Sequence, residues 1–267
     1  MKISLIINDQ YHTPLGVKRY CLDRLVPGLS LGFKWNFAKV VVRSRRACFK
    51  GLYDDEAWAA SSLENFRLLE RAGGVFHIDG VEHFRNLKGP AVFVSNHMST
   101  LETMVFPFLI APHKRVTFVV KDSLVTHPIF GPVMRSRDPI VVSRHDSRQD
   151  LLEVMKKGTS LLSEGISVVI FPQSTRRLEF HPEEFNSLGV KLAGRAGVPV
   201  IPMAIKTDFW LNGRILKDLG PFDMRNRDIR IRFGQPLTIT GTGKDENQQI
   251  IRFIQTNLEE WKVSANR

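Results

Sequence analysis

The stretch AVFVSNHMSTLE, residues 91–102, decides how we expect the rest of the chain to fold. Its apolar first part, residues 91–94, follows a Gly-Pro pair and predicts a short buried strand that ends in a turn. Ser99 or Thr100 can then cap a helix whose apolar side chains face inward. His97 is therefore expected between the carboxyl end of a strand and the start of a helix, which is where ligands bind in open α/β sheets.

His97 allows two interpretations. An imidazole changes its charge near neutral pH, so a histidine in such a turn is a candidate general base. Ser99 and Glu102, however, have the spacing of a capping box, which would explain Glu102 by helix capping alone. The stretch by itself leaves a catalytic and a structural role open.

Short β-rich runs alternate with helical patterns after Gly74. The expected strands are residues 75–78, 91–94, 116–120, 140–142, 168–171, 198–205 and 229–233, and the expected helices between and after them are residues 147–163, 188–196 and 247–263. Several of the strands are unbroken apolar runs, which is typical of strands that are covered on both faces. The last strand alternates with Arg230 and Arg232 and is expected near an edge. The pattern predicts an α/β fold with a mostly parallel central sheet flanked by helices.

Positive charge is concentrated at the start of the chain. Residues 1–50 hold ten Lys and Arg against two Asp, which is +8 of the total formal charge of +11. This asymmetry favours contact with an anionic surface, either a membrane or a nucleic acid. Because no recognised nucleic-acid-binding motif accompanies it, we expect an anionic membrane surface and no nucleic acid. We divide the chain into a basic helical N-terminal appendage, residues 1–73, and an α/β domain, residues 74–267.

Two helices are expected in the appendage, at residues 31–50 and 55–72. The first carries a basic stripe of Lys39, Arg43, Arg46 and Lys50, and an apolar side of Phe33, Phe37, Val40, Val41 and Cys48. This pattern is typical of a helix that lies in the interface of a membrane. It equally fits a helix that docks on the domain with a solvated basic face, and periodicity cannot distinguish the two.

The remaining composition limits location and metal chemistry. The apolar start at residues 3–7 is too short for a secretory signal, and no run reaches the roughly 18 apolar residues of a membrane-spanning helix. Cys21 and Cys48 have neither metal-site spacing nor a disulfide framework. The histidines show no paired-ligand spacing, so we expect no metal. The chain is expected to lie peripherally on the cytoplasmic face of a membrane.

Four further segments leave strand ends or lie between them: KDSLVTHPIFG (121–131), IVVSR (140–144), FPQSTRR (171–177) and VPVIP (198–202). With NHMSTLE, and in this order, they resemble the phospholipid/glycerol acyltransferase family, which contains the lysophosphatidate and glycerol-3-phosphate acyltransferases. That family is marked by Asn-His followed after four residues by Asp, a strand that ends in Arg, Phe-Pro-Glu-Gly-Thr-Arg, and a Val-Pro-x-x-Pro strand. The resemblance covers roughly residues 74–236, and several ordered blocks are far more specific than one motif.

Two departures from the family pattern bear on the expected chemistry. Glu102 stands where the family has Asp, but a glutamate carboxylate can also orient an imidazole. Gln173 and Ser174 stand where the family has Glu-Gly. Glutamine keeps the acceptor oxygen but loses the charge, and serine adopts a positive φ less readily than glycine. These changes leave the identity of the acyl acceptor open.

The resemblance implies a glycerol-3-phosphate acyltransferase-like fold and acyl transfer from acyl-CoA or acyl carrier protein to the free hydroxyl of a lysophospholipid, foremost 1-acylglycerol-3-phosphate. In that reaction His97 is the general base and Glu102 orients it, with no metal and no cofactor beyond the acyl donor as co-substrate. The residues that it assigns to substrate binding are Asn96, Lys121, Arg144, Gln173, Thr175 and Arg176. The developing oxyanion is expected at backbone amides near Met98 and Ser99.

Two alternatives remain. The acceptor is a different lysolipid, a glycolipid or an aminolipid, or the protein is a non-catalytic peripheral membrane-binding protein of the same fold. Neither the acyl chain length, nor the choice between the two donors, nor the oligomeric state follows from the sequence.

Overall fold

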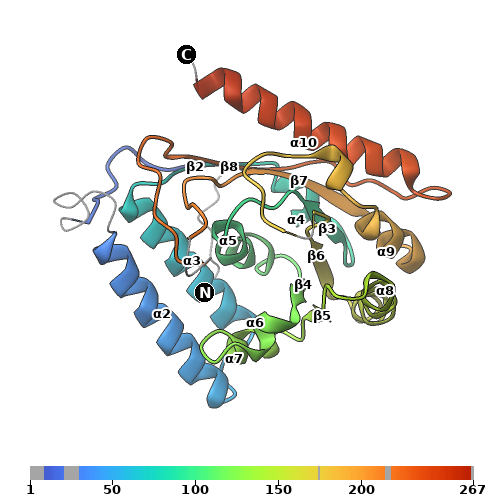
Figure 1. Ribbon diagram of the computed structural model, residues 1–267, viewed down its shortest axis with the longest axis horizontal. Helices are drawn as coiled ribbons and strands as arrows, with labels where there is room; N and C mark the ends of the chain where they lie inside the picture. The colour runs from blue at the N-terminus through green and yellow to red at the C-terminus, as the bar shows by residue number, and fades with distance from the viewer. Residues whose placement is uncertain (1–8, 21–29, 174, 214–217, 266–267) are drawn as a thin grey trace.

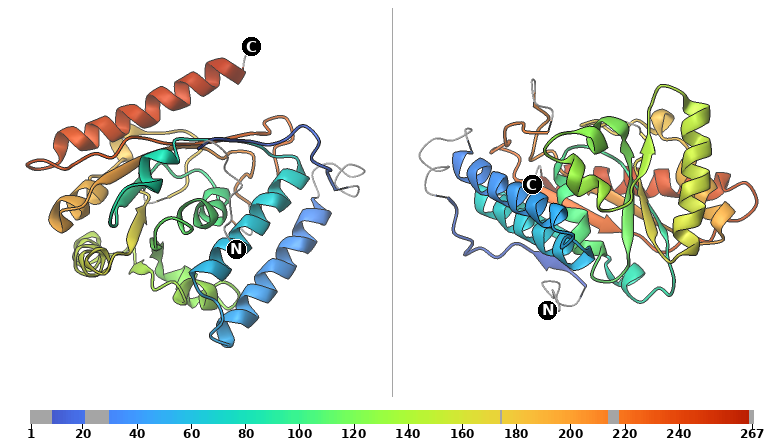
Figure 2. Two further views of the ribbon diagram at one scale, coloured as in Figure 1. Left: turned by 180° about the vertical axis from the view of Figure 1, so that it is seen from behind. Right: turned by 90° about the horizontal axis from the view of Figure 1, so that it is seen from below.

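The computed structural model describes residues 9–20, 30–173, 175–213 and 218–265. Over these residues the chain forms three layers, with one eight-stranded sheet between two layers of helices (Figure 1, Figure 2). The apolar start at residues 3–7, Cys21 and Ser174 lie outside the described residues.

The sheet is mostly parallel, as predicted. Its strands are β1 (Tyr11–His12), β2 (Val75–Asp79), β3 (Val92–Ser95), β4 (Val116–Lys121), β5 (Ile140–Val142), β6 (Ser167–Ile170), β7 (Val200–Lys206) and β8 (Asp228–Phe233). They are ordered β1-β2-β8-β7-β3-β6-β4-β5. Among the strand pairs of the described residues, β1–β2 and β7–β8 are antiparallel and the others are parallel. The carboxyl ends of β3, β4, β5, β6 and β7 therefore meet at one edge, where the candidate residues leave the sheet.

Helices cover both faces of the sheet. One face carries α2 (Leu31–Phe49), α3 (Asp55–Ala72), α4 (Glu82–Arg85), α5 (Leu101–Ile110), α6 (Asp122–Thr126) and α7 (Gly131–Arg135). The other carries α8 (Ser147–Ser163), α9 (Leu188–Ala196) and α10 (Lys244–Ala265), and a short 3-10 helix spans Pro182–Glu184. Asp54 and Asp146 accept backbone hydrogen bonds at the starts of α3 and α8, which explains where these helices begin. Each face of the sheet buries its own cluster of apolar side chains.

The prediction that the last strand lies near an edge is wrong. β8 lies between β2 and β7, inside the sheet. Its two arginines are tolerated there because other groups cover them. Arg232 pairs with Glu260 of α10 and lies over the ring of Trp261, and Arg230 pairs with Asp228. The edge strands are β1 and β5. The strand at the edge nearer to β8, β1, has only two residues and left no periodic signal.

The predicted boundary between residues 73 and 74 does not separate two cores. β1 pairs with β2, and the buried side chains of α2 and α3 belong to the same cluster as those of the sheet. Phe33 and Phe37 lie 5.1 and 5.8 Å, centroid to centroid, from the ring of Trp210. The apolar side of α2 therefore docks on the protein, and its basic side remains at the surface. Within the described ranges, no helix has the length and apolar character needed to cross a membrane.

Candidate active site

The turn after β3 is fixed by an extension of the sheet. The side chain of Asn96 donates to the carbonyl oxygen of Ile205 at 2.9 Å and accepts from the amide of the same residue at 3.0 Å. These two bonds continue the pairing of β3 with β7 by one side chain beyond Ser95. Asn96 is almost completely buried and does not line the cavity described below. Its position instead determines where His97 leaves the sheet.

His97 and Glu102 lie in direct contact. The Nδ1 atom of His97 is 2.8 Å from Oε1 of Glu102, whose side chain is fully buried. Oε1 also accepts from the backbone amides of Met98 and Ser99 at 2.7 and 2.8 Å. Oε2 accepts from the hydroxyls of Ser99 and Thr207 at 3.0 and 2.7 Å. One carboxylate thus caps α5 and holds the imidazole.

These contacts keep Glu102 ionised. Burial of the carboxyl group opposes ionisation, but the hydrogen bond from His97, its charge, and the donors of Thr207 and Ser99 outweigh burial and lower the pKa of Glu102 below its usual value. An ionised carboxylate can only accept hydrogen bonds, so Nδ1 of His97 carries the proton of this contact. The Nε2 atom is then left as the basic nitrogen of the neutral ring.

The same contacts correct one expectation. The amides of Met98 and Ser99 donate to Glu102, and the amide of His97 donates to Oε1 of Gln173 at 3.0 Å. These three amides are therefore engaged inside the turn, and the expected oxyanion site near Met98 and Ser99 does not exist in this arrangement.

The segment after β6 packs against the other side of His97. The ring of Phe171 stacks on the imidazole at 4.2 Å between centroids, and the amide of Arg177 donates to the carbonyl oxygen of His97 at 2.8 Å. Gln173 is buried and outside the cavity lining, with its side-chain nitrogen unpaired in the described part of the chain. Thr175 is exposed and also lies outside the cavity lining. The loop after β6 therefore holds His97 in place through the ring of Phe171 and through hydrogen bonds to the backbone of His97.

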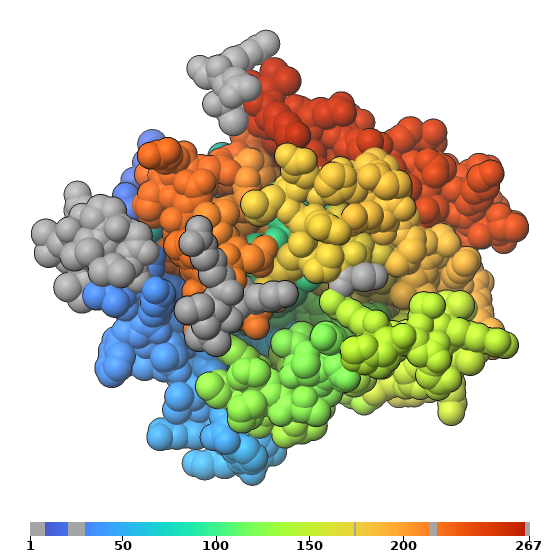
Figure 3. Space-filling model, in the orientation of Figure 1, coloured from blue at the N-terminus to red at the C-terminus, as the bar shows by residue number. Residues whose placement is uncertain are grey.

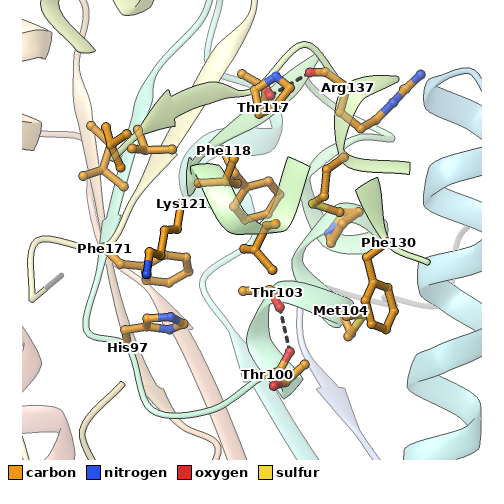
Figure 4. A pocket seen from close by; sticks show the side chains of 18 of the residues that line it. His97, Thr100, Thr103, Met104, Thr117, Phe118, Lys121, Phe130, Arg137 and Phe171 are labelled. Atoms are coloured by element: carbon orange, nitrogen blue, oxygen red, sulfur yellow. Dashed lines mark hydrogen bonds between the residues drawn. The ribbon is translucent and has the colours of Figure 1, made fainter. Parts of the chain in front are cut away.

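A cavity of about 710 Å³ opens in front of His97. Figure 3 shows the hollow between the green segment and the yellow and orange segments of the chain. Its walls are largely apolar, and they come from α2, α3, α5, α7 and β4; they include Phe37, Val41, Trp58, Met104, Phe118 and Val133. In Figure 4 the side chain of Lys121 lies beside Phe171 on the same side of the cavity as His97, while Arg137 and Thr117 lie farther away.

Three predicted cationic residues line this cavity together with His97: Lys121, Arg144 and Arg176. Arg144 has a positive φ of 62°, and its amide donates to Asp150, which also accepts from Ser143. Burial, and then the nearby charge of Arg176, lower the pKa of Arg144. Within the described part of the chain, the side-chain charges of Lys121 and Arg144 have no ion-pair or hydrogen-bond partner.

Arg176 is engaged. Its Nη2 atom lies 2.5 Å from Oδ1 of Asp218, and its Nη1 atom donates to Oδ1 of Asn212 at 3.2 Å. Arg148 and Lys191 also line the cavity, although neither was assigned to the site from the sequence. Arg177, in contrast, pairs with Glu184 at the surface.

Several residues of the site were missed by the sequence analysis. They are Thr207 and Ser99 on Glu102, Asp150 beneath Arg144, and Asp218 and Asn212 on Arg176. Ser99 was expected as a helix cap and, through its amide, near the oxyanion, but the contact of its hydroxyl with Glu102 was not expected. The described ranges contain no group of three or more His, Cys, Asp or Glu side chains that could hold a metal ion.

The fold and this site define a class: an α/β protein with a buried histidine–carboxylate pair facing a largely apolar cavity that is lined by cations. Comparison with known families agrees with that class. The profile of the family described as Acyltransferase matches residues 75–206. Through this region the chain belongs to the phospholipid/glycerol acyltransferase family.

Individual relatives support the assignment. The chain is 26% identical over 180 residues to a chloroplastic 1-acyl-sn-glycerol-3-phosphate acyltransferase of Arabidopsis thaliana, covering 67% of this chain and 46% of that protein. It is 33% identical over 133 residues to a 1-acyl-sn-glycerol-3-phosphate acyltransferase of Pseudomonas aeruginosa, covering 50% of each. The chain thus spans about half the length of the curated relatives it matches.

A solved structure shares the fold. The crystal structure of the 1-acyl-sn-glycerophosphate acyltransferase PlsC from Thermotoga maritima superposes with a TM-score of 0.63 at 18% identity, covering 88% of this chain and 95% of that one. At this identity the likeness concerns the fold alone. It confirms the predicted α/β architecture with a mostly parallel sheet flanked by helices.

Proposed function

We propose that the protein transfers a fatty acyl group from a thioester donor to the free hydroxyl of a lysophospholipid, foremost 1-acylglycerol-3-phosphate. The observation that carries the proposal is the contact of His97 with the buried carboxylate of Glu102, at 2.8 Å, in front of a largely apolar cavity. The names of the family relatives support the same class of reaction.

His97 acts as the general base in this proposal. Its Nε2 atom accepts the proton of the acceptor hydroxyl, and the oxygen attacks the carbonyl carbon of the thioester. The carbon–sulfur bond then breaks, and the imidazolium returns the proton to the departing thiolate. Glu102 stabilises the imidazolium and fixes the ring, without becoming protonated itself. The nucleophile is thus the substrate oxygen, and no covalent intermediate forms on the protein.

Lys121 and Arg144 bind the acceptor phosphate in this proposal. Both line the cavity beside His97 and carry charges without a protein partner in the described ranges. An arginine fork suits a phosphate group, and a lysine adds a point charge. With the expected backbone amides engaged, these cations are also the donors best placed to stabilise a developing oxyanion.

The apolar part of the cavity holds the acyl chain. Side chains from α2, α3, α5 and β4 form its walls, and burying methylene groups there stabilises binding. The donor is acyl-CoA or acyl carrier protein, used as a co-substrate. Asn96 and Gln173 act through the backbone on either side of His97, so they position the base without contacting the acceptor.

The protein works at a membrane in this proposal, because its lipid substrates reside there. The exposed basic side of α2 is the surface that contacts anionic headgroups, on the cytoplasmic face and without crossing the bilayer.

Replacement of His97 tests the proposed function. We expect the purified His97→Ala variant to fold as the wild type by circular dichroism and to lose transfer of a labelled acyl group to lysophosphatidate with both donors. His181→Ala, a surface histidine paired with Glu183, is the control that should keep full activity. Transfer by His97→Ala at the wild-type rate would exclude His97 as the base.

The same assay decides the acceptor. The pair Gln173-Ser174 motivated a different acceptor. Gln173 lies outside the cavity lining, so its side chain gives no contact that favours another lipid, and Ser174 lies outside the described residues. Turnover of a glycolipid or aminolipid but not of lysophosphatidate would nevertheless identify that alternative. Absence of turnover with every thioester would favour the non-catalytic protein.

A further inference from the structure

The segment after β7 places a carboxylate at the cationic end of the cavity. Oδ1 of Asp218 lies 2.5 Å from Nη2 of Arg176 and accepts from the hydroxyl of Thr100 at 3.2 Å. Asp218, Arg176 and Thr100 all line the cavity that contains His97.

Asn212 supports the same arrangement from the other end of this segment. Its Oδ1 accepts from Nη1 of Arg176 at 3.2 Å, and its Nδ2 donates to the carbonyl oxygen of Met98 at 3.2 Å. Asn212 therefore contacts both the turn that carries His97 and the loop that carries Arg176. The side chain of Asp218 is 34% exposed and that of Arg176 20%, so the pair lies at the boundary between the cavity and solvent.

The ion pair changes the charge that an acceptor meets. A phosphate monoester carries a charge of about −1.5 to −2 at neutral pH. Arg176 attracts it, but the carboxylate of Asp218 is held against Arg176 and repels it, so the pair as a whole offers little net attraction. Among the described residues, the cavity-lining cations whose side chains have no ion-pair or hydrogen-bond partner are Lys121, Arg144, Arg148 and Lys191.

We propose that Asp218 is a specificity-determining residue: its carboxylate offsets the charge of Arg176 and weakens binding of acceptors that carry a phosphate monoester relative to uncharged acceptors. This inference rests on the proposed function, because it assigns an acceptor preference to the same site. The product carries the same phosphate as the acceptor, so Asp218 weakens product binding as well. A residue that only held the loop in place would affect charged and uncharged acceptors alike.

Asp218→Asn isolates the charge. Asparagine keeps an oxygen that can accept from Arg176 and Thr100 but removes the negative charge. Asp223→Asn is the matched control, since Asp223 caps a turn in the same segment and does not line the cavity. The KM of each protein is measured for lysophosphatidate and for the uncharged monoacylglycerol with the same acyl chain.

For Asp218→Asn we expect the KM for lysophosphatidate to fall by about threefold to tenfold, the range for one partly exposed charge, with kcat changed by less than about twofold. The inhibition constant of the product phosphatidate should fall by a similar factor. The KM for monoacylglycerol should stay within about twofold, and Asp223→Asn should match the wild type. A raised or unchanged KM for lysophosphatidate, or an equal change for both acceptors, would overturn the inference.

A binding measurement separates this inference from the proposed function. If the wild type acylates no lysolipid, the proposed function fails, and the dissociation constant of sn-glycerol 3-phosphate is then measured by calorimetry for wild type and Asp218→Asn. Tighter binding by the variant, with glycerol as the uncharged reference, supports the role of Asp218 in excluding phosphate. Equal or weaker binding rejects it.

Discussion

Glu102 performs two tasks that the sequence presented as alternatives. Its Oε1 atom holds the imidazole of His97 and the first amides of the turn, as a capping box and a histidine orienter would each require. Its Oε2 atom accepts from Thr207, at the end of β7. Because one carboxylate carries all these bonds, helix capping and ring orientation cannot be separated by deleting the side chain. They can be separated by removing only its charge.

Glu102→Gln should lower kcat/KM by about 10²- to 10⁴-fold, because a neutral amide no longer stabilises the imidazolium and can present its NH₂ group to the ring. Steady-state kinetics with saturating donor measure this change. Glu184→Gln, which alters a surface ion pair with Arg177, is the control and should keep the kcat/KM of the wild type. Activity of Glu102→Gln within about threefold of the wild type would mean that the carboxylate serves capping alone.

In the same variant, Glu102→Gln, the free energy of unfolding should depend less on pH in the acidic range than in the wild type. The lowered pKa of Glu102 means that the folded state favours the ionised carboxylate. Its contribution is fully present above the ordinary value of 4.5 and is lost as the pH falls through the lower folded value. The difference in unfolding free energy between wild type and Glu102→Gln, from urea titrations, should therefore shrink as the pH falls below 4.5. A difference that is constant from pH 7 to pH 3 would contradict this.

The sequence identified the residues that lie on short motifs and missed their distant partners. His97, Lys121, Arg144 and Arg176 line one cavity because each lies at or after the carboxyl end of a strand, and these ends meet at the same edge. Thr207 lies 105 residues from Glu102, and no spacing rule connects the two. The sequence also could not indicate that the side-chain amide of Asn96 both donates to and accepts from the backbone of Ile205, since these bonds depend on the register of β3 with β7.

At the level of elements, α2 presents a different exposed face from the one that its apolar spacing suggested. Phe33, Phe37 and Val40 are buried in the protein. The opposite side exposes Trp35 and Phe49, which are 67% and 66% exposed, with Val42 between them at seven-residue intervals. Lys39 and Arg45 lie over the rings of Trp35 and Phe49, respectively. We define Trp35, Val42 and Phe49 as the aromatic stripe, and its mixture of rings and cations is typical of an interfacial helix.

Replacing the aromatic stripe should weaken membrane binding without destabilising the fold. For Trp35→Ser combined with Phe49→Ser we expect affinity for anionic vesicles to fall by about tenfold or more, since each exposed ring loses its apolar contact with lipid. Vesicle co-sedimentation measures the affinity, and thermal unfolding should be unchanged. Val263→Ser is the control, because Val263 is an exposed residue of α10 on the other face of the sheet. If the double variant binds vesicles like the wild type, α2 does not face lipid.

The basic side of α2 allows a separate test by charge. In the basic stripe, Arg43 pairs with Glu64. The cations of this stripe that remain to contact lipid headgroups are therefore Lys39, Arg46 and Lys50. Changing these three to Gln should weaken binding to anionic vesicles by about 1 kcal/mol each at low salt, and binding of wild type should weaken with added salt. Neutral vesicles provide the reference. Equal loss on neutral and anionic vesicles would show that the effect is not electrostatic.

For the whole molecule, the sequence predicted the class of fold because most strands are apolar runs and several helices have marked ends. The bounds of α3, α8 and α9 agree with the predicted residues 55–72, 147–163 and 188–196. The place of β8 and the docking of α2 could not be predicted, because both depend on which distant element covers a given side. Arg232 is covered by α10, and Phe33 by Trp210, and neither contact has a local signal.

The docking of α2 has a consequence for the whole molecule, because it closes one wall of the cavity. Phe37, Val40 and Val41 of α2, together with Trp58 of α3 and Phe118 of β4, line the space that we assign to the acyl chain. The helix that we propose to face the membrane on one side therefore limits the cavity on the other. The size of side chains on its inner face should then determine which acyl chains the protein accepts.

Val41→Phe should shift the preference toward shorter donors. A ring at this position would displace about two methylene groups, each worth ~0.8 kcal/mol on burial, so the ratio of kcat/KM for a 16-carbon over a 10-carbon donor should fall by about tenfold. Val42→Phe is the matched control, because the neighbouring side chain is exposed on the opposite side of α2 and does not line the cavity. Thermal unfolding shows whether Val41→Phe is still folded. A folded Val41→Phe protein with the wild-type chain-length profile would mean that the acyl chain does not lie between α2 and the sheet, even if His97 proves to be the base.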